Sequence, residues 1–164
     1  MEVKQIGVIH TPFLEATGTP IQPRYAEGME GWVEVFDEFV SGLKDLEGFE
    51  RVWLIYWFDR ASFEDGEWVI KPYLDDNLRG VFATRAPYRP NPIGVSAVCL
   101  LEVRGNRLTV QEVDILDGTP LLDIKPYVSQ FDCFEVARSG WVREADSRKA
   151  LSDNRFERKT RGRP

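Results

Sequence analysis

Cysteine and histidine are scarce in this sequence of 164 residues. Cys99 and Cys133 are the only cysteines, they form no C-x-x-C pair, and His10 is the only histidine. Structural zinc is usually held by clustered cysteine and histidine ligands, so we expect no metal site. Two isolated thiols suit a reducing compartment, in which both stay unpaired.

Long apolar stretches are also missing. The longest apolar run, 52–58, is far shorter than the roughly 20 residues that a membrane-spanning helix needs. Residues 1–10 lack the apolar core of a signal peptide, and Glu2 follows the first methionine. We therefore expect a cytoplasmic protein without a membrane partner.

No G-x-G-x-x-G motif follows a first strand, and no β-α-β alternation of adequate length is present. A Rossmann-type fold is therefore disfavoured. The formal net charge of −6 argues weakly against a nucleic-acid partner. Positive charge nevertheless gathers in a basic tail at Arg155, Arg158, Lys159, Arg161 and Arg163. Such a tail can reach phosphates, and a solvated, frayed terminus is the alternative interpretation.

Short segments rich in β-branched and aromatic residues are separated by glycine and proline turns, a pattern typical of strands. After Arg51, residues 52–58 are β-branched, aromatic or otherwise apolar without alternation, which predicts over 51–58 a central strand buried on both faces. Gly105-Asn106 is a tight turn that predicts a hairpin. The other expected strands are 6–9, 32–36, 68–70, 80–84, 94–103 and 108–113.

Many short strands joined by such turns favour a mainly β fold, a closed or nearly closed single-sheeted β-barrel. The polarity pattern adds a short helix over 37–43, capped by Asp37, and a C-terminal helix over 141–156. The expected organisation is a barrel domain over 1–137, followed by a short C-terminal helix and the basic tail over 138–164.

The first of three candidate site segments is 18–23, in which Pro20 and Pro23 fix the backbone on either side of Gln22. A loop held in this way can present an amide or its own backbone groups to a ligand such as adenine. A plain surface loop is the alternative.

The second segment, 79–96, places Arg79, Arg85 and Arg89 within eleven residues, on a connection stiffened by three prolines. Arginine offers a planar, permanently charged fork for carboxylate or phosphate. The cluster favours a ligand site in a shaped loop between two strands. Pairing of these arginines with buried carboxylates is the alternative.

The third segment, 114–127, combines Asp114, Asp117 and Asp123 with a turn at Gly118 and with Lys125. Its carboxylates could bind ribose hydroxyls, face a cationic ligand or accept a proton, or they could be turn residues and core salt bridges. Asp123 and Lys125 could form a buried pair. The residues alone do not separate these interpretations.

At these segments the sequence resembles the TsaA-like domain of the TrmO-type tRNA methyltransferase family. The resemblance covers about residues 3–132. It rests on the motifs IGVIHTPF (6–13), GTPIQ (18–22), GLKDLEGF (42–49), GVFATR (80–85), RPNPIG (89–94) and DGTPLLDIKPY (117–127). The last two motifs are unusual enough to make a chance match improbable.

The resemblance implies a barrel rather than a Rossmann fold, a homodimer, and S-adenosylmethionine as cofactor. The substrate would be a threonine tRNA that already carries threonylcarbamoyl-adenosine beside the anticodon, methylated on its exocyclic N6. Longer members carry a further C-terminal domain, so we expect the tRNA contacts of 141–164 to differ from theirs. A non-catalytic module that binds an adenine metabolite and a small-molecule methyltransferase are the alternatives.

By position, the resemblance assigns cofactor contacts to Pro20, Ile21, Gln22, Asp59, Arg60, Arg85, Arg89, Asp117, Gly118, Thr119 and Pro120. Substrate contacts are expected from Arg79, Tyr88, Arg89 and Lys125. Asp114 or Asp117 would be catalytic, since a carboxylate near the acceptor amine can orient it and receive its proton.

Overall fold

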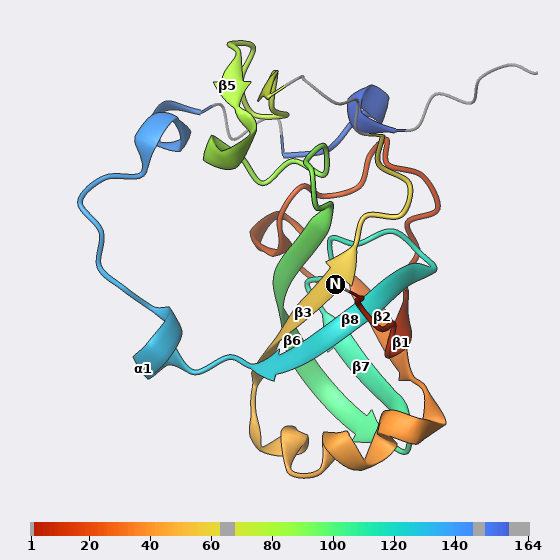
Figure 1. Ribbon diagram of the computed structural model, residues 1–164. Coiled ribbons are helices and arrows are strands. Elements are labelled where there is room, and N and C mark those ends of the chain that lie inside the picture. Colours follow the sequence, from red (N-terminus) through yellow and green to blue (C-terminus); the bar gives the residue numbers. More distant parts are fainter. Residues whose placement is uncertain (1, 63–67, 146–149, 158–164) are drawn as a thin grey trace, which may run out of the picture.

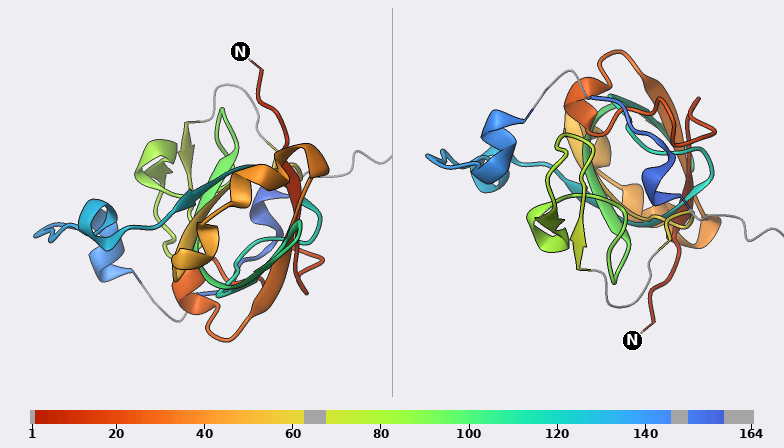
Figure 2. Two further views of the ribbon diagram at one scale, coloured as in Figure 1. Left: turned by 90° about the horizontal axis from the view of Figure 1, so that it is seen from below. Right: turned by 90° about the horizontal axis from the view of Figure 1, so that it is seen from above.

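The structure, a computed structural model, describes residues 2–62, 68–145 and 150–157. Its main feature is a closed antiparallel barrel with strand order β1-β2-β7-β6-β3-β8 (Figure 1). The strands are β1 (Gly7–His10), β2 (Glu30–Val35), β3 (Arg51–Trp57), β6 (Ile93–Arg104), β7 (Arg107–Gln111) and β8 (Thr119–Pro126). The views along the barrel show the sheet closing on itself (Figure 2). The mainly β, single-sheeted barrel expected from the sequence is confirmed.

Strand β3 alternates between a buried and a half-exposed face. Val52, Leu54 and Tyr56 point into the barrel, whereas Trp53 and Ile55 lie on its outer face. The predicted burial of this strand on both faces is therefore wrong for the single chain. Its outer residues are apolar all the same, which is why the sequence shows no alternation.

The barrel interior is almost entirely aliphatic. It is filled by Ile9, Val33, Val35, Leu54, Leu108, Val110 and Leu121, among others. On β6 the inward residues are Gly94, Ser96 and Val98, which lie opposite the inward residues of β3. Ser96 is thus a buried hydroxyl in apolar surroundings, where a polar group needs a hydrogen-bond partner.

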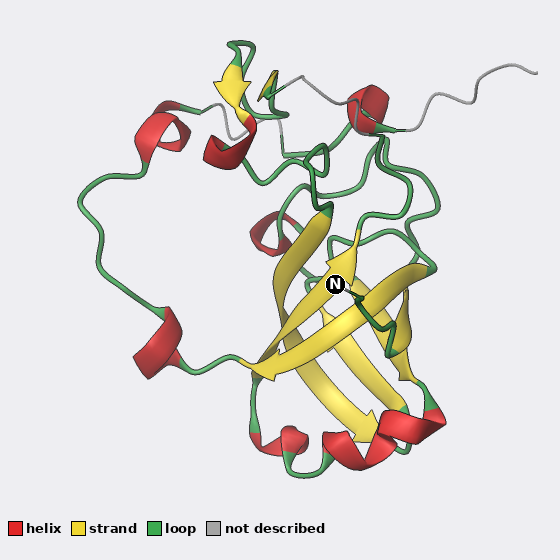
Figure 3. Ribbon diagram, viewed as in Figure 1, coloured by secondary structure: helices red, strands yellow, loops and turns green. Residues whose placement is uncertain are grey.

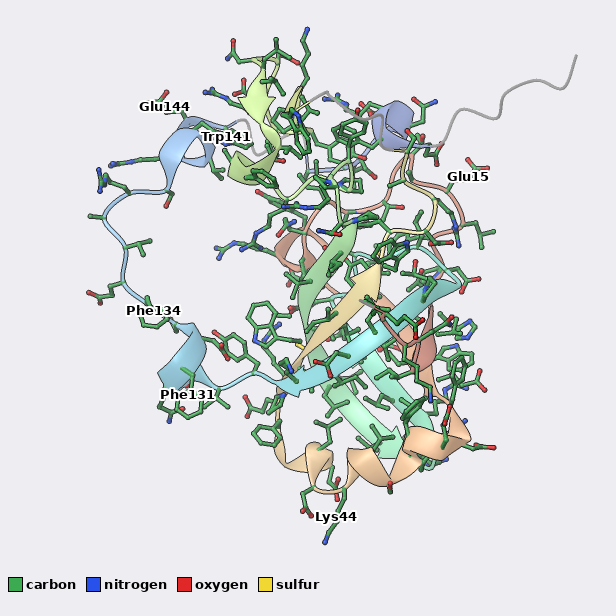
Figure 4. All side chains as sticks on the ribbon, viewed as in Figure 1. Glu15, Lys44, Phe131, Phe134, Trp141 and Glu144 are labelled. Carbon is green, nitrogen blue, oxygen red and sulfur yellow. The ribbon has the colours of Figure 1, made fainter. Side chains whose placement is uncertain are left out.

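One end of the barrel is covered by the 3-10 helices η2 (Asp37–Leu43) and η3 (Leu46–Gly48), which bury Leu43 and Leu46. The short helix predicted over 37–43 is present. Asp37 begins it and does not cap it, because Phe36 holds the N-cap position and no side chain caps the helix. Lys44 marks this end of the molecule and Glu15 lies towards the other (Figure 4).

The other end carries loops and a small sheet of β4 (Val69–Ile70) and β5 (Arg79–Gly80). The strand predicted over 80–84 is wrong, since Gly80 ends β5 and the 3-10 helix η4 (Val81–Ala83) follows. The Thr84 hydroxyl donates to the Val81 carbonyl at 2.8 Å and closes this turn. A second, smaller core of Ile70, Ala86, Tyr88 and Phe156 holds these loops together.

The C-terminal part leaves β8 as an arm that carries α1 (Ser129–Asp132) and stands away from the barrel (Figure 1). The described residues of the helix predicted over 141–156 form two separate 3-10 helices, η5 (Gly140–Glu144) and η6 (Asn154–Phe156) (Figure 3). Between them Leu151 is extended and pairs with Pro20. Backbone pairing with a distant loop has replaced local helical bonding.

Most of the basic tail, Arg158, Lys159, Arg161 and Arg163, lies outside the described residues. Arg155 is held by Asp153 at 2.6 Å and by the Pro72 carbonyl at 2.9 Å. Within the described ranges no helix is long and apolar enough to cross a membrane. Cys99 and Cys133 are free thiols.

Candidate functional site

A cleft of about 1030 Å³ opens at the loop-bearing end of the barrel, opposite η2 and η3. Segments far apart in the sequence form its walls, among them the loop at 19–25, the exit of β3, the loop at 82–95 and the C-terminal stretch at 152–157. Cofactor and substrate pockets commonly measure about 300–1,000 Å³. The cleft therefore has room for a nucleotide-sized ligand.

Nine of the residues expected to contact a ligand line this cleft: Pro20, Ile21, Gln22, Asp59, Arg60, Arg85, Arg89, Asp114 and Thr119. The closed barrel brings them together although they span a hundred positions of the chain. Arg79, Tyr88, Asp117, Gly118, Pro120 and Lys125 lie outside the lining.

The loop that carries Gln22 is fixed by the C-terminal stretch. The Ser152 N–H donates to the Thr19 carbonyl at 2.8 Å, and the Ile21 N–H donates to the Ala150 carbonyl at 3.0 Å. The Gln22 side chain accepts a hydrogen bond from Arg85 Nη1 at 2.8 Å. This hydrogen bond joins the loop that carries Arg85 to the loop that carries Gln22, and it holds both side chains in place before a ligand binds.

The Asp117-Gly118 turn lies outside the lining of the cleft and holds a residue that lines it. Its Asp117 carboxylate accepts the Thr11 N–H at 3.1 Å and lies 3.4 Å from His10 Nδ1, so it faces β1. The Asp117 carbonyl accepts a hydrogen bond from Arg60 Nη2. Gly118 has φ +76°, a conformation that favours glycine. The turn therefore positions Arg60 through its backbone.

Asp114 is the carboxylate of this segment that reaches the cleft. Its Oδ1 accepts a hydrogen bond of 2.6 Å from Ser96 Oγ, which lies 3.1 Å from the Tyr56 hydroxyl. Burial raises the pKa of Asp114 to about 7, against the opposing effects of the Ser96 hydrogen bond and the charge of Arg85. A carboxyl group with that pKa can accept a proton near neutral pH.

Sequence reasoning missed Ser96 and Tyr56. The sequence gives little indication of Ser96, because a single serine at an inward position of a strand is commonly a small residue that the core tolerates. Its partner on β3 is 40 positions away, and only the register of the two strands brings the hydroxyl groups together.

Arg79 and Tyr88 support the walls. Arg79 pairs with Asp75 at 2.6 Å, and its guanidinium lies 5.5 Å from the ring centroid of Trp141. Tyr88 is buried in the smaller core against Phe156. Both residues therefore hold groups that line the cleft.

Lys125 lies on β8 and pairs with Asp123 at 2.7 Å. The side chains of the pair are 61% and 43% exposed, so the predicted buried pair is a surface pair. The reason is the strand geometry, which turns both side chains outward, with Lys125 opposite Trp53 and Asp123 opposite Ile55 of β3. The pair stands apart from the cleft.

Aromatic side chains that were not among the expected site residues also line the cleft, notably Phe58, Tyr73, Phe82 and Trp141. Trp141 Nε1 donates to the Ala83 carbonyl at 2.8 Å, which attaches the returning arm to η4 (Figure 4). Exposed aromatic faces stack bases. Trp141 lies outside the family motifs, so only the path of the arm brings it to the site.

The charged side chains of the cleft favour anions despite the acidic sequence. Four arginines line it, Arg24, Arg60, Arg85 and Arg89, against three acids, Asp59, Asp114 and Glu157. Arg24 comes from η1 (Pro23–Tyr25) and was not foreseen. Within the described ranges no group of His, Cys, Asp and Glu side chains is placed to hold a metal.

Comparison with known proteins identifies the fold and its relatives. The family described as tRNA-methyltransferase O N-terminal domain matches residues 8–133. A crystal structure of TrmO from Pseudomonas aeruginosa superposes with a TM-score of 0.71 at 40% identity. That match covers 86% of this chain and 62% of the TrmO chain.

Two curated relatives extend the comparison. A probable S-adenosyl-L-methionine-binding protein of Pyrococcus abyssi is 53% identical over 155 residues, 93% of this chain and 83% of its own. The tRNA (adenine(37)-N6)-methyltransferase of Escherichia coli is 34% identical over 154 residues, 88% of this chain and 65% of its own. The chain thus spans less than two thirds of the Escherichia coli enzyme.

Proposed function

The chain belongs to the tRNA-methyltransferase O N-terminal domain family, and on this premise we propose that it methylates tRNA with S-adenosylmethionine. The acceptor would be the exocyclic N6 of threonylcarbamoyl-adenosine beside the anticodon of threonine tRNA. One observation carries the proposal. The cleft joins the preorganised Gln22–Arg85 pair to Asp114, a carboxyl group whose pKa of about 7 suits proton transfer.

The residues present fit such a cofactor. Aromatic faces at Phe58, Phe82 and Trp141 suit an adenine ring, and the carboxylate of Asp59 suits ribose hydroxyls or a positive charge. The guanidinium of Arg85 or Arg89 suits a carboxylate. The cleft volume of about 1030 Å³ leaves room for an acceptor base as well.

When bound, S-adenosylmethionine supplies a methyl group on a positively charged sulfur and needs no further activation. The work of the protein is then alignment, to which fixed loops contribute by limiting the freedom lost on binding. Asp114 would receive the proton that the acceptor nitrogen loses. Asp117 contributes through the backbone of its turn, since its carboxylate faces β1.

A requirement for the threonylcarbamoyl group would follow from the arginines. Arg89 lies in the cleft lining, with its Nη1 3.3–3.4 Å from two carbonyls of its own loop, those of Thr84 and Ala86. Held there, it can bind the threonine carboxylate with Arg85. Arg79 and Tyr88 act in this proposal by supporting the walls, and Lys125 would meet tRNA outside the cleft.

We also propose that the protein is a homodimer. The outer face of β3 and β6 is apolar, and Ile93 and Val95, which lie where this face meets the cleft, are 40% and 44% exposed. The neighbouring arm exposes Phe131 and Phe134 by 72% and 76% (Figure 4). Exposed apolar side chains that gather on one face often mark an interaction site. A second copy that covers this face would bury β3 on both sides, as its apolar sequence suggests.

Calorimetric titration with S-adenosylmethionine tests the cofactor site. Methyl transfer is then followed by nucleoside mass spectrometry with threonine tRNA that carries threonylcarbamoyl-adenosine, with the unmodified tRNA, and with free adenosine. Transfer to the modified tRNA alone is expected. Binding without transfer would favour a non-catalytic module, and transfer to adenosine would favour a small-molecule methyltransferase.

A further inference from the structure

A buried hydrogen-bonded chain lies next to the cleft, with Tyr56 at one end and Asp114 at the other. Ser96 and Tyr56 are 2% and 3% exposed, and they lie on the neighbouring strands β6 and β3. Their hydroxyl oxygens are 3.1 Å apart, and Ser96 Oγ lies 2.6 Å from Asp114 Oδ1. Asp114 and Tyr56 both line the cleft, and the buried Ser96 hydroxyl lies between them.

The direction of the chain follows from the number of protons. Ser96 has one hydroxyl proton and donates it to Asp114 Oδ1. The Ser96 oxygen must then accept from Tyr56, whose phenol keeps its proton because burial raises its pKa well above the ordinary value. The order is therefore Tyr56 to Ser96 to Asp114, and each donor supports the ionised carboxylate.

We propose that Ser96, supported by Tyr56, is a positioning residue for Asp114 in the methyl-transfer reaction. This inference rests on the proposed function, in which Asp114 receives the proton of the acceptor nitrogen. Ser96 holds one carboxylate oxygen, so the side chain keeps a single rotamer and the second oxygen is free to take the proton. The hydroxyl also favours the ionised form, which is the form that can act as a base.

Loss of the hydroxyl has a defined electrostatic sign. Among charged groups, Arg85 acts on Asp114 and favours its ionised form; Tyr56 is neutral, and burial opposes ionisation. Removing the Ser96 donor leaves burial less opposed, so the pKa of Asp114 rises. Loss of one hydrogen bond to a charged carboxylate is expected to raise its pKa by about one unit.

The test is Ser96→Ala in the full chain. Carbon-13 NMR of labelled aspartate follows the Asp114 carboxyl, identified by its loss in Asp114→Asn, and single-turnover methyl transfer is measured from pH 6 to 9.5. We expect the midpoint of Asp114 and the acidic limb of the rate profile to rise together by about one pH unit. The rate at pH 7 then falls about fivefold and recovers above about pH 9.

Ser96→Thr keeps the hydroxyl and should restore both midpoints, and Tyr56→Phe should shift them in the same direction by less. Val98→Ala, a buried deletion on the same strand, should reduce stability without moving either midpoint. An unchanged NMR midpoint in Ser96→Ala overturns the inference. So does an NMR shift without a shift of the rate profile. If the wild type transfers no methyl group, while Ser96→Ala still raises the NMR midpoint of Asp114, the proposed function is refuted instead.

Discussion

Gly94 and Tyr56 lie opposite each other in the ladder between β6 and β3, and a Cβ at Gly94 would stand 2.2 Å from the Tyr56 ring. The ring occupies the space that any other residue at position 94 would need. The absence of a side chain at Gly94 therefore allows the Tyr56 hydroxyl to reach Ser96. A glycine in the family motif RPNPIG thus has a packing role in the lining of the cleft.

Gly94→Ala is expected to destabilise the protein. Overpacking a buried site costs about 1–3 kcal/mol, because the Tyr56 ring must move against the core. Urea denaturation at pH 7 measures the loss. The matched control is Gly42→Ala, since a Cβ there meets no atom within 4 Å, and its effect should stay within about 0.5 kcal/mol. Equal midpoints for the two variants would contradict this account.

Stability should depend on pH through Asp114. Burial raises its pKa in the folded protein to about 7, above the ordinary value of about 3.9. Between these values the folded state binds more protons than the unfolded state, so this contribution is complete below about pH 4 and is lost as the pH rises through 7. Asp114→Asn removes it.

Urea denaturation of both proteins at pH 4.5, 6 and 8 measures this effect. The free energy of unfolding of the wild type should fall relative to Asp114→Asn as the pH rises. Other titrating groups cancel in the comparison when they lie far from Asp114. A constant difference between the two proteins would show that Asp114 titrates near its ordinary pKa.

Arg85→Ala should weaken the binding of S-adenosylmethionine. The change removes the donor that holds Gln22 Oε1 at 2.8 Å and one positive charge of the cleft. Loss of such a contact corresponds to about a tenfold rise in Kd, measured by calorimetry. Arg104→Ala is the control, because its side chain is 83% exposed and pairs with Glu102. Equal affinities for the two variants would exclude Arg85 from the cofactor site.

Phe131→Glu combined with Phe134→Glu should give a monomer. The two rings are 72% and 76% exposed on the arm, and charges there oppose burial of the apolar face against a second copy. Sedimentation velocity at several concentrations measures the assembly. Val3→Glu, also at an exposed apolar position, should keep the wild-type state. A wild type that is itself monomeric at all concentrations would remove the dimer from the proposal.

The sequence by itself indicated five of the six barrel strands, and it missed β8 (Thr119–Pro126), whose sequence we interpret as a segment of carboxylates and a turn. Gly105-Asn106 indicated the hairpin of β6 and β7, because a two-residue turn with a left-handed glycine needs little tertiary support. The rigid loops that carry Gln22 and Arg85 could also be predicted, since proline fixes the backbone locally. The family motifs added the function that these patterns alone do not contain.

Tertiary structure decided which polar groups meet. Closure of the barrel placed Ser96 between Tyr56 and Asp114, and it turned the Asp117 carboxylate towards β1 and away from the cleft. Local patterns could not indicate this, because the register of two strands is set by the packing of the whole sheet.

The same holds for the C-terminal stretch around Leu151, where polarity predicted a helix. Its backbone instead pairs with the loop around Pro20, and this pairing builds a wall of the cleft. Local propensity differs between helix and extended chain by fractions of a kcal/mol per residue, which a few long-range hydrogen bonds can overcome. The sequence therefore determined the parts of the site, and only the closed barrel decided how they face one another.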